Sequence, residues 1–292
     1  MKFLYLFILA AAVSHGAIAQ TPDENASQFI FLPPGLQFAP LKANIQEPRV
    51  GVFKFLDASE MKVDIGNAID VFGLDLPASN VKFRVGIDFM AYAFTTGAQG
   101  LRLQIDAVDG FFGGNLSVSK DYGNHQLEGR LRILHQSAHL VDGHYVESTN
   151  SWIDNRRPIP FTRDFGELTV AHDVEQSFWR TRYYAGTAYA TLVRPNAIER
   201  LSYLAGLEAS TDKILGTISG LPTNIFVAYQ IDIRGTPTYA STHQIQLGCK
   251  FGKWYEKGPT IYLGYYTGQH MFAEYYDERI TTIGAGFTMD WD

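Results

Sequence analysis

The sequence predicts an all-β fold: an antiparallel transmembrane β-barrel of about 12 strands, within a range of roughly 10 to 14, preceded by a cleaved signal peptide. Three observations predict it. The 292-residue chain is 14% aromatic but only 18% charged, whereas soluble domains carry about 25% charged residues. Its mean hydropathy is close to neutral at −0.08. Beyond the N-terminus, segments of alternating polarity replace any apolar run long enough for a spanning helix.

The composition also excludes several classes of protein. A net charge of −6 gives no basic footprint for nucleic acid. A single cysteine, Cys249, excludes a disulfide scaffold and a cysteine-rich zinc module. The high aromatic content argues against disorder. We therefore expect outer-membrane lipids as partners, no nucleic-acid partner and no cofactor. The sequence does not indicate an oligomeric state.

The first 48 residues divide into two segments. Lys2 precedes an almost wholly apolar run over 3–13, and Ala17-Ile18-Ala19 fits a small-x-small cleavage site. The run is too short to span a bilayer, so residues 1–19 are predicted to be a secretory signal peptide. Residues 20–48 contain several prolines and show no periodicity, which indicates an irregular periplasmic lead-in. The predicted barrel occupies residues 49–292.

Thirteen candidate strands follow the lead-in. Single-chain bacterial barrels have an even number of strands, so one candidate must be a merger or a misreading. The weakest is 101–108, and we therefore expect about twelve. The candidates are 49–56, 60–68, 82–95, 101–108, 111–120, 125–138, 165–174, 180–192, 200–209, 223–234, 239–251, 258–268 and 279–288.

Alternation within these segments predicts which face meets lipid. In 125–138, one face carries Leu127, Leu131 and Ile133. The other face carries Glu128, Arg130 and Arg132. A membrane barrel turns its apolar side chains outward and its polar ones inward. Arg130 and Arg132 are thus expected in the lumen, where they would bind or select solutes.

Two further patterns carry local expectations. The Gly-rich run at 110–114 lacks the lysine and hydroxyl of a phosphate loop, and we expect a hairpin turn there. Aromatic residues crowd the last hairpin, where Tyr and Trp are expected to form an interfacial girdle. They are Tyr262, Tyr265, Tyr266, Phe272, Tyr275 and Tyr276.

The end of the 125–138 strand carries the residues best suited to chemistry. The two-residue period extends its apolar face through His135, Ser137 and His139. An imidazole two residues from a hydroxyl can activate it as a nucleophile if a third group orients the ring. Alternatively, the strand leaves the membrane here and these side chains are simply solvated. A metal site on His135 and His139 lacks a third ligand, so none is expected.

Residues 135–142 and the lead-in resemble a bacterial outer-membrane family, the "domain of unknown function twelve hundred and seven". Its hallmark, His-Gln-Ser-Ser-His-Leu-Gly-Asp-Glu, is matched at His135, Gln136, Ser137, His139, Leu140 and Asp142, whereas Ala138, Val141 and Gly143 depart from it. The family's lead-in pattern is matched at Leu32-Pro33, Pro40-Leu41, Ala43 and Glu47-Pro48-Arg49. The resemblance implies an outer-membrane barrel of a Gram-negative bacterium. It makes His139 and Asp142 candidate binding residues and brings no established activity.

The run His135-Gln136-Ser137 also resembles the catalytic His-x-Ser of outer-membrane phospholipase A and the lipid A deacylase. This likeness implies Ser137 as nucleophile and His135 as base on a lipid-facing strand, with calcium as a possible cofactor. Ala138 and His139 depart from the phospholipase pattern. The candidates for the orienting group are Glu147 and Asn150 in the following loop.

Three interpretations of function follow from these residues. The first is an integral outer-membrane barrel with a structural, binding or small-solute passage role. The second is an outer-membrane lipid acyl hydrolase that uses the lipid-facing His-x-Ser pair. The third is a soluble periplasmic β protein. Long loops are extracellular in this architecture, so the segment 139–164 would place His135 and Ser137 towards the outer leaflet.

Overall fold

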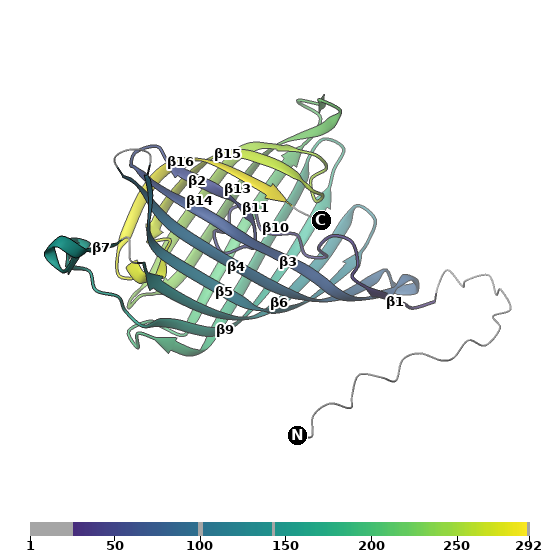
Figure 1. Cartoon of the computed structure of the whole chain (residues 1–292). Helices are drawn as coiled ribbons and strands as arrows, with labels where there is room; N and C mark the ends of the chain where they lie inside the picture. The colour runs from purple at the N-terminus through teal and green to yellow at the C-terminus, as the bar shows by residue number, and fades with distance from the viewer. Residues whose placement is uncertain (1–25, 99–101, 142–143, 291–292) are drawn as a thin grey trace, which may run out of the picture.

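Twelve antiparallel strands close into a barrel in the computed structural model, which describes residues 26–98, 102–141 and 144–290 (Figure 1). The predicted signal peptide at 1–19 and candidate Asp142 lie outside the described residues. The barrel strands are β2 (Val50–Phe55), β3 (Glu60–Leu76), β4 (Val81–Ala98), β5 (Arg102–Asp121), β6 (His125–Leu140), β9 (Phe161–Glu175), β10 (Arg180–Arg194), β11 (Leu201–Thr211), β13 (Leu221–Gly235), β14 (Tyr239–Phe251), β15 (Gly258–Gln269) and β16 (Arg279–Asp290).

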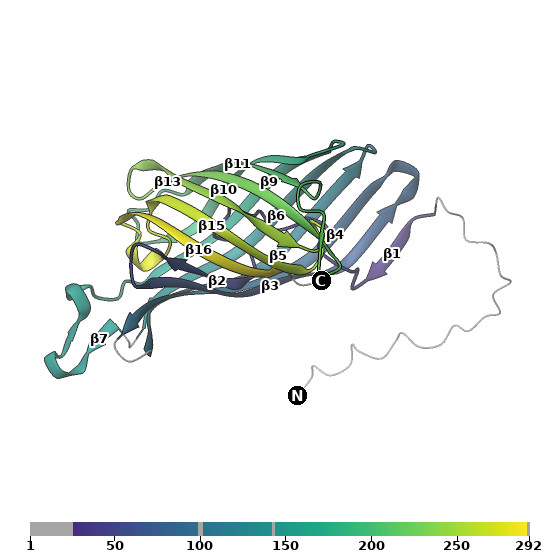
Figure 2. The ribbon, with the colours of Figure 1, turned by 90° about the horizontal axis from the view of Figure 1, so that it is seen from above.

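Four short strands lie outside this ring. β1 (Gln28–Phe31) pairs with the last residues of β3, and β12 (Thr217–Ile218) pairs with the start of β13. β7 (Tyr145–Val146) and β8 (Ser151–Trp152) form a small hairpin in the long β6–β9 connection. No helix of the described residues is long and apolar enough to cross a membrane. Figure 2 shows the barrel from above, with β1 at one end and β7 at the other.

The expected count of about twelve strands is confirmed, and the extra candidate arose because one strand was divided in two. Segments 101–108 and 111–120 belong to one strand, β5, which runs through the Gly-rich run without turning. The hairpin turn predicted at 110–114 is therefore wrong. β5 pairs along its length with β4 and β6. A side chain at Gly113 would meet the backbone oxygen of Ile133 on β6, so glycine here permits close approach of strands.

The alternation along β6 divides its residues as predicted. Leu127, Leu131 and Ile133 are exposed on the outer surface, whereas Arg130 and Arg132 are buried in the lumen. Closure of the ring pairs the backbone groups of each barrel strand with its two neighbours. The apolar outer surface then presents side chains that are compatible with the hydrocarbon of lipid. The chain is accordingly an outer-membrane β-barrel protein.

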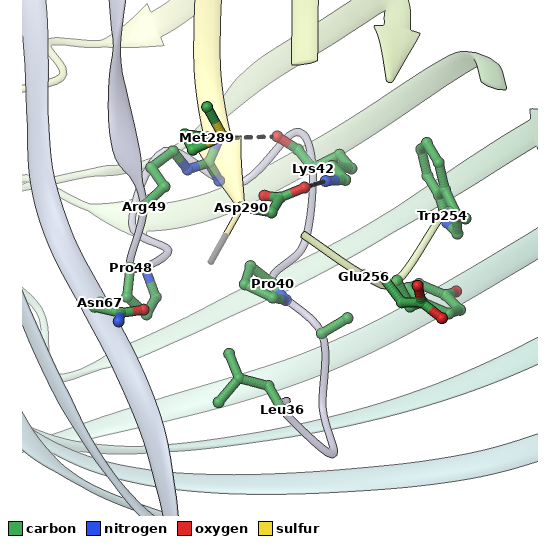
Figure 3. Close-up of a pocket in the computed structure, with 12 residues that line it drawn as sticks. Leu36, Pro40, Lys42, Pro48, Arg49, Asn67, Trp254, Glu256, Met289 and Asp290 are labelled. Carbon is green, nitrogen blue, oxygen red and sulfur yellow. Dashed lines mark hydrogen bonds and ion pairs between the residues drawn. The ribbon is translucent and has the colours of Figure 1, made fainter. Parts of the chain in front are cut away.

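Residues 33–48 of the predicted lead-in lie in the lumen, whereas we expected them in the periplasm. Leu41, Ala43 and Glu47 have no exposed surface, and Figure 3 shows Leu36, Pro40 and Lys42 inside the ring of strands. Residues 33–48 form no helix or strand, whereas Gln28–Phe31 of the same predicted lead-in form β1. The burial of these residues was not predicted, because their partners, such as Arg130 and Arg132, lie more than 80 residues away in the chain. We call residues 33–48 the plug.

Charged side chains on the inner wall hold the plug. Both carboxylate oxygens of Glu47 accept hydrogen bonds from Arg130, one at 2.9 Å. Arg132 donates to the carbonyl oxygen of Gln46 at 3.2 Å and to the carboxylate of Glu167 at 2.7 Å. Arg130 and Arg132 therefore bind the chain's own plug.

A second segment closes the opposite mouth of the barrel. Residues 270–278 connect β15 to β16 and include the 3-10 turn η5 (Ala273–Tyr275). Phe272 and Tyr275 are buried and pack against Phe94 of β4. The backbone amide of Ala273 donates to Asp109 on the inner wall. We call residues 270–278 the cap.

The aromatic hairpin therefore differs from its prediction. Tyr262, Tyr266, Phe272 and Tyr275 fill the interior instead of forming an interfacial girdle, whereas Tyr265 faces outward. Cavities beside the plug are small: one of about 30 Å³ lies between the plug and the cap, and two of about 40 and 10 Å³ lie between the plug and the wall. Each holds at most a few water molecules.

Replacing Glu47 with Gln should destabilise the barrel by about 3–5 kcal/mol, because it leaves the buried Arg130 guanidinium without its carboxylate. The loss is measured as a lower urea concentration at which half of the protein migrates as the unfolded band in detergent gels. Lys253→Gln is the control, since it breaks an exposed pair with Glu256 and should change the midpoint little. Equal effects of the two substitutions would contradict the role given to the plug.

The cap should loosen in acid. Burial lowers the pKa of His270 from 6.5 to about 4, and its Nδ1 accepts the Phe272 amide proton at 3.2 Å. Because the folded pKa is depressed, this stability is present above about pH 6.5 and is lost as the pH falls towards 4. Hydrogen exchange of the Tyr275 amide, corrected for its intrinsic rate, should show falling protection over that range. His270→Gln should remove the pH dependence; an unchanged dependence would refute this explanation.

Candidate functional site

The side chains of His135 and Ser137 point away from the lumen, on the lipid-facing side of β6. Their neighbours Leu134, Gln136 and Ala138 are buried inside, which fixes the alternation. The side chain of His135 is 34% exposed. β6 ends at Leu140, where the chain enters the long connection to β9. The pair therefore lies on the outer wall near the end of the barrel that carries this long loop.

Asp164 of β9 orients the His135 ring. The two residues are directly paired in the β6–β9 ladder, and His135 Nδ1 lies 2.6 Å from Asp164 Oδ1. With the proton on Nδ1, the ring donates to the carboxylate and leaves Nε2 free to accept a proton. This is the arrangement of base and orienting acid in a catalytic triad. The sequence reasoning did not name Asp164.

Phe112 of β5 packs on the other side of the ring, with centroids 4.8 Å apart. His135 is thus held between two neighbouring strands. The position level with Ser137 on β5 is Gly110, where an added Cβ would lie 3.8 Å from the Ser137 hydroxyl oxygen. The absence of a side chain there leaves the Ser137 hydroxyl uncovered on the β5 side.

A β-bulge in β10 supports Asp164 from the far side. The register of β10 against β9 shifts between Ala190 and Leu192, so Thr191 is the extra residue. Its hydroxyl donates to the Asp164 carbonyl oxygen at 3.2 Å. Arg200 donates to the carbonyl oxygens of Ala190 and Thr191. The bulge thereby fixes the backbone that carries the orienting carboxylate.

Ser137 lies two residues from His135, so their Cα atoms are about 6.7 Å apart along the strand. Within the described part of the chain, no hydrogen bond joins the Ser137 hydroxyl to the ring. Catalytic hydrogen bonds of this kind commonly tighten only when substrate binds. Thr162 of β9 pairs with Ser137 in the ladder, which places a second hydroxyl beside the first on the outer wall.

The loop candidates Glu147 and Asn150 lie elsewhere. Both belong to the hairpin around β7, which Figures 1 and 2 show projecting beyond the barrel. Glu147 begins the 3-10 turn η3 (Glu147–Thr149), and the Asn150 side chain accepts a hydrogen bond from Tyr145. The structure gives the ring of His135 its carboxylate partner from β9 instead.

The remaining candidates divide between wall and lumen. His139 is exposed on the outer face, two residues beyond Ser137. Arg130 and Arg132 are committed to the plug, as described above. Among the described residues, no group of three or more His, Cys, Asp or Glu side chains could hold a metal ion.

Solved structures similar to this chain are outer-membrane barrels. An active-site mutant of outer-membrane phospholipase A from Escherichia coli has a TM-score of 0.49 at 12% identity, covering 88% of this chain and 93% of that chain. The toluene transporter TodX of Pseudomonas putida has a TM-score of 0.42 at 11% identity, covering 80% and 70%. LpxR from Salmonella typhimurium has a TM-score of 0.36 at 13% identity, covering 80% and 88%.

These likenesses concern the barrel fold, and no activity is inferred from them. No protein-family model matches the chain, and no curated protein matches it. The resemblance to the outer-membrane family of unknown function therefore gains no support and stays a prediction.

Proposed function

We propose that the chain is an outer-membrane lipid acyl hydrolase whose site lies on the lipid-facing wall. The observation that carries the proposal is the 2.6 Å contact between His135 Nδ1 and Asp164 Oδ1, with Ser137 on the same outward face. A polar group facing hydrocarbon is costly, and in membranes such groups are often functional. Here three of them gather on two paired strands.

The proposed reaction proceeds in two steps. The Ser137 hydroxyl oxygen attacks the carbonyl carbon of a lipid ester while His135 Nε2 takes its proton. His135 then gives that proton to the leaving alcohol oxygen, and the acyl group stays on Ser137. Water attacks the acyl-enzyme with His135 again as base, which releases the fatty acid and restores the serine. Asp164 stabilises the charged imidazolium in both steps.

The closed lumen weighs against small-solute passage. Its charged residues Arg130 and Arg132 bind the plug, and two cavities beside the plug have volumes of only about 40 and 10 Å³, room for a few waters at most. A binding or structural role on the outer wall would need no imidazole aligned with a carboxylate. The hydrolase proposal gives that alignment a purpose.

Ser137→Ala should lower fatty-acid release from phospholipid in mixed micelles by at least about 10³-fold, since it removes the nucleophile. Release is measured for wild type and variant at equal protein, with and without calcium. Heat-modifiable migration on gels checks that the variant still folds. If the wild-type protein releases no fatty acid under either condition, the proposal fails.

Asp164→Ala should lower the turnover rate by roughly 10²- to 10⁴-fold, because the ring loses its orienting partner. Asp164→Asn, which keeps a hydrogen-bond acceptor, should retain more activity than Asp164→Ala. Glu147→Ala is the control variant, because Glu147 lies in the loop that projects beyond the barrel. It should change the turnover rate by less than about twofold. A larger loss for Glu147→Ala than for Asp164→Ala would assign the orienting role to the loop.

A further inference from the structure

We propose that Arg194 is a specificity-determining residue that binds the phosphate group of the lipid substrate. The inference rests on the proposed function and adds to it a headgroup contact outside the triad. Arg194 is the last residue of β10 and is exposed, whereas its neighbour Val193 is buried. Its side chain therefore points to the outer surface, where the strand enters the β10–β11 loop.

The strand ladders place Arg194 level with the nucleophile. Ser137 of β6 pairs with Thr162 of β9, and Thr162 pairs with Arg194 of β10. Neighbouring strands lie about 4.8 Å apart, so the backbones at Ser137 and Arg194 are separated by roughly 10 Å. A phospholipid joins its ester carbonyl to its phosphate through a short glycerol linkage. The long arginine side chain can reach the phosphate while the ester rests on Ser137.

The bulge in β10 is what gives Arg194 this position. If the register continued unbroken from Ala190, Val193 would pair with Thr162 and would face outward in the row of Ser137. With the bulge, Leu192 pairs with Asp164 and Arg194 pairs with Thr162. Bulges commonly re-aim a side chain beside a functional site. The same bulge holds the Asp164 backbone through Thr191, so one irregularity serves both the orienting acid and the proposed phosphate contact.

The chemistry of Arg194 suits this ligand. In the described part of the chain, Arg194 has no ion-pair partner, unlike the lumen arginines Arg130 and Arg132. A guanidinium binds phosphate through two parallel hydrogen bonds and is less strongly hydrated than an ammonium. The outward row also offers space, since it continues through Thr162 and Ser137 to Gly110. No acidic side chain stands in this row.

The test compares an ester with and without phosphate. Wild type, Arg194→Gln and Arg279→Gln are assayed in mixed micelles against dipalmitoyl phosphatidylethanolamine and dipalmitoylglycerol. Arg279 is the matched control, because it is an exposed arginine at the same end of the barrel on β16. We expect the ratio of kcat/KM values, phospholipid over diacylglycerol, to fall about tenfold in Arg194→Gln, as expected for one lost charge-assisted contact. Arg279→Gln should keep the wild-type ratio.

Further arms separate the sources of phosphate and the two proposals. A parallel assay with lipid A identifies the source of the phosphate. The source is the lipid, lipid A or glycerophospholipid, whose turnover falls in Arg194→Gln. An unchanged ratio in Arg194→Gln, with wild type active on both esters, overturns the role of Arg194 alone. If no ester is hydrolysed, binding decides the matter. Ser137→Ala should then retain labelled phosphatidylethanolamine better than Ser137→Ala/Arg194→Gln, and equal retention overturns the inference.

Discussion

The buried ion pairs between β6 and the plug determine where this barrel can function. Glu47 enters the lumen on an irregular segment and accepts from Arg130, while Arg132 binds the neighbouring backbone and Glu167. These contacts occupy the polar inner wall that would otherwise line a channel. The same strand turns His135 and Ser137 outward, three and five residues beyond Arg132. A lumen committed to its own plug leaves the outer wall as the surface on which the chain can act.

The period of the strands made much of this predictable. The alternation of Leu131 and Arg132 fixed which face of β6 meets lipid, and extending it placed His135 and Ser137 correctly. The number of strands followed from the even-number rule, although the Gly-rich run looked like a turn. Glycines in β5 instead relieve contacts with β6, as at Gly113, and a single sequence does not distinguish that role from a turn.

Long-range placement was the part that the sequence did not yield. Asp164 lies 29 residues after His135, across a loop that hides the register of β9 against β6. Without that register, nearby polar residues in the loop looked better placed. The burial of Tyr262 and Phe272 was missed for a related reason, because alternation describes a strand against lipid and gives no information about segments that fold back into the lumen.

The position of the plug in the chain has a consequence for assembly. The plug runs directly into β2, and β2 pairs with the C-terminal strand β16 to close the ring. The closing pair is therefore formed by the strand that immediately follows the plug and by β16. Because Arg49 alone separates the plug from β2, a seated plug fixes where the first strand of this closing pair can lie.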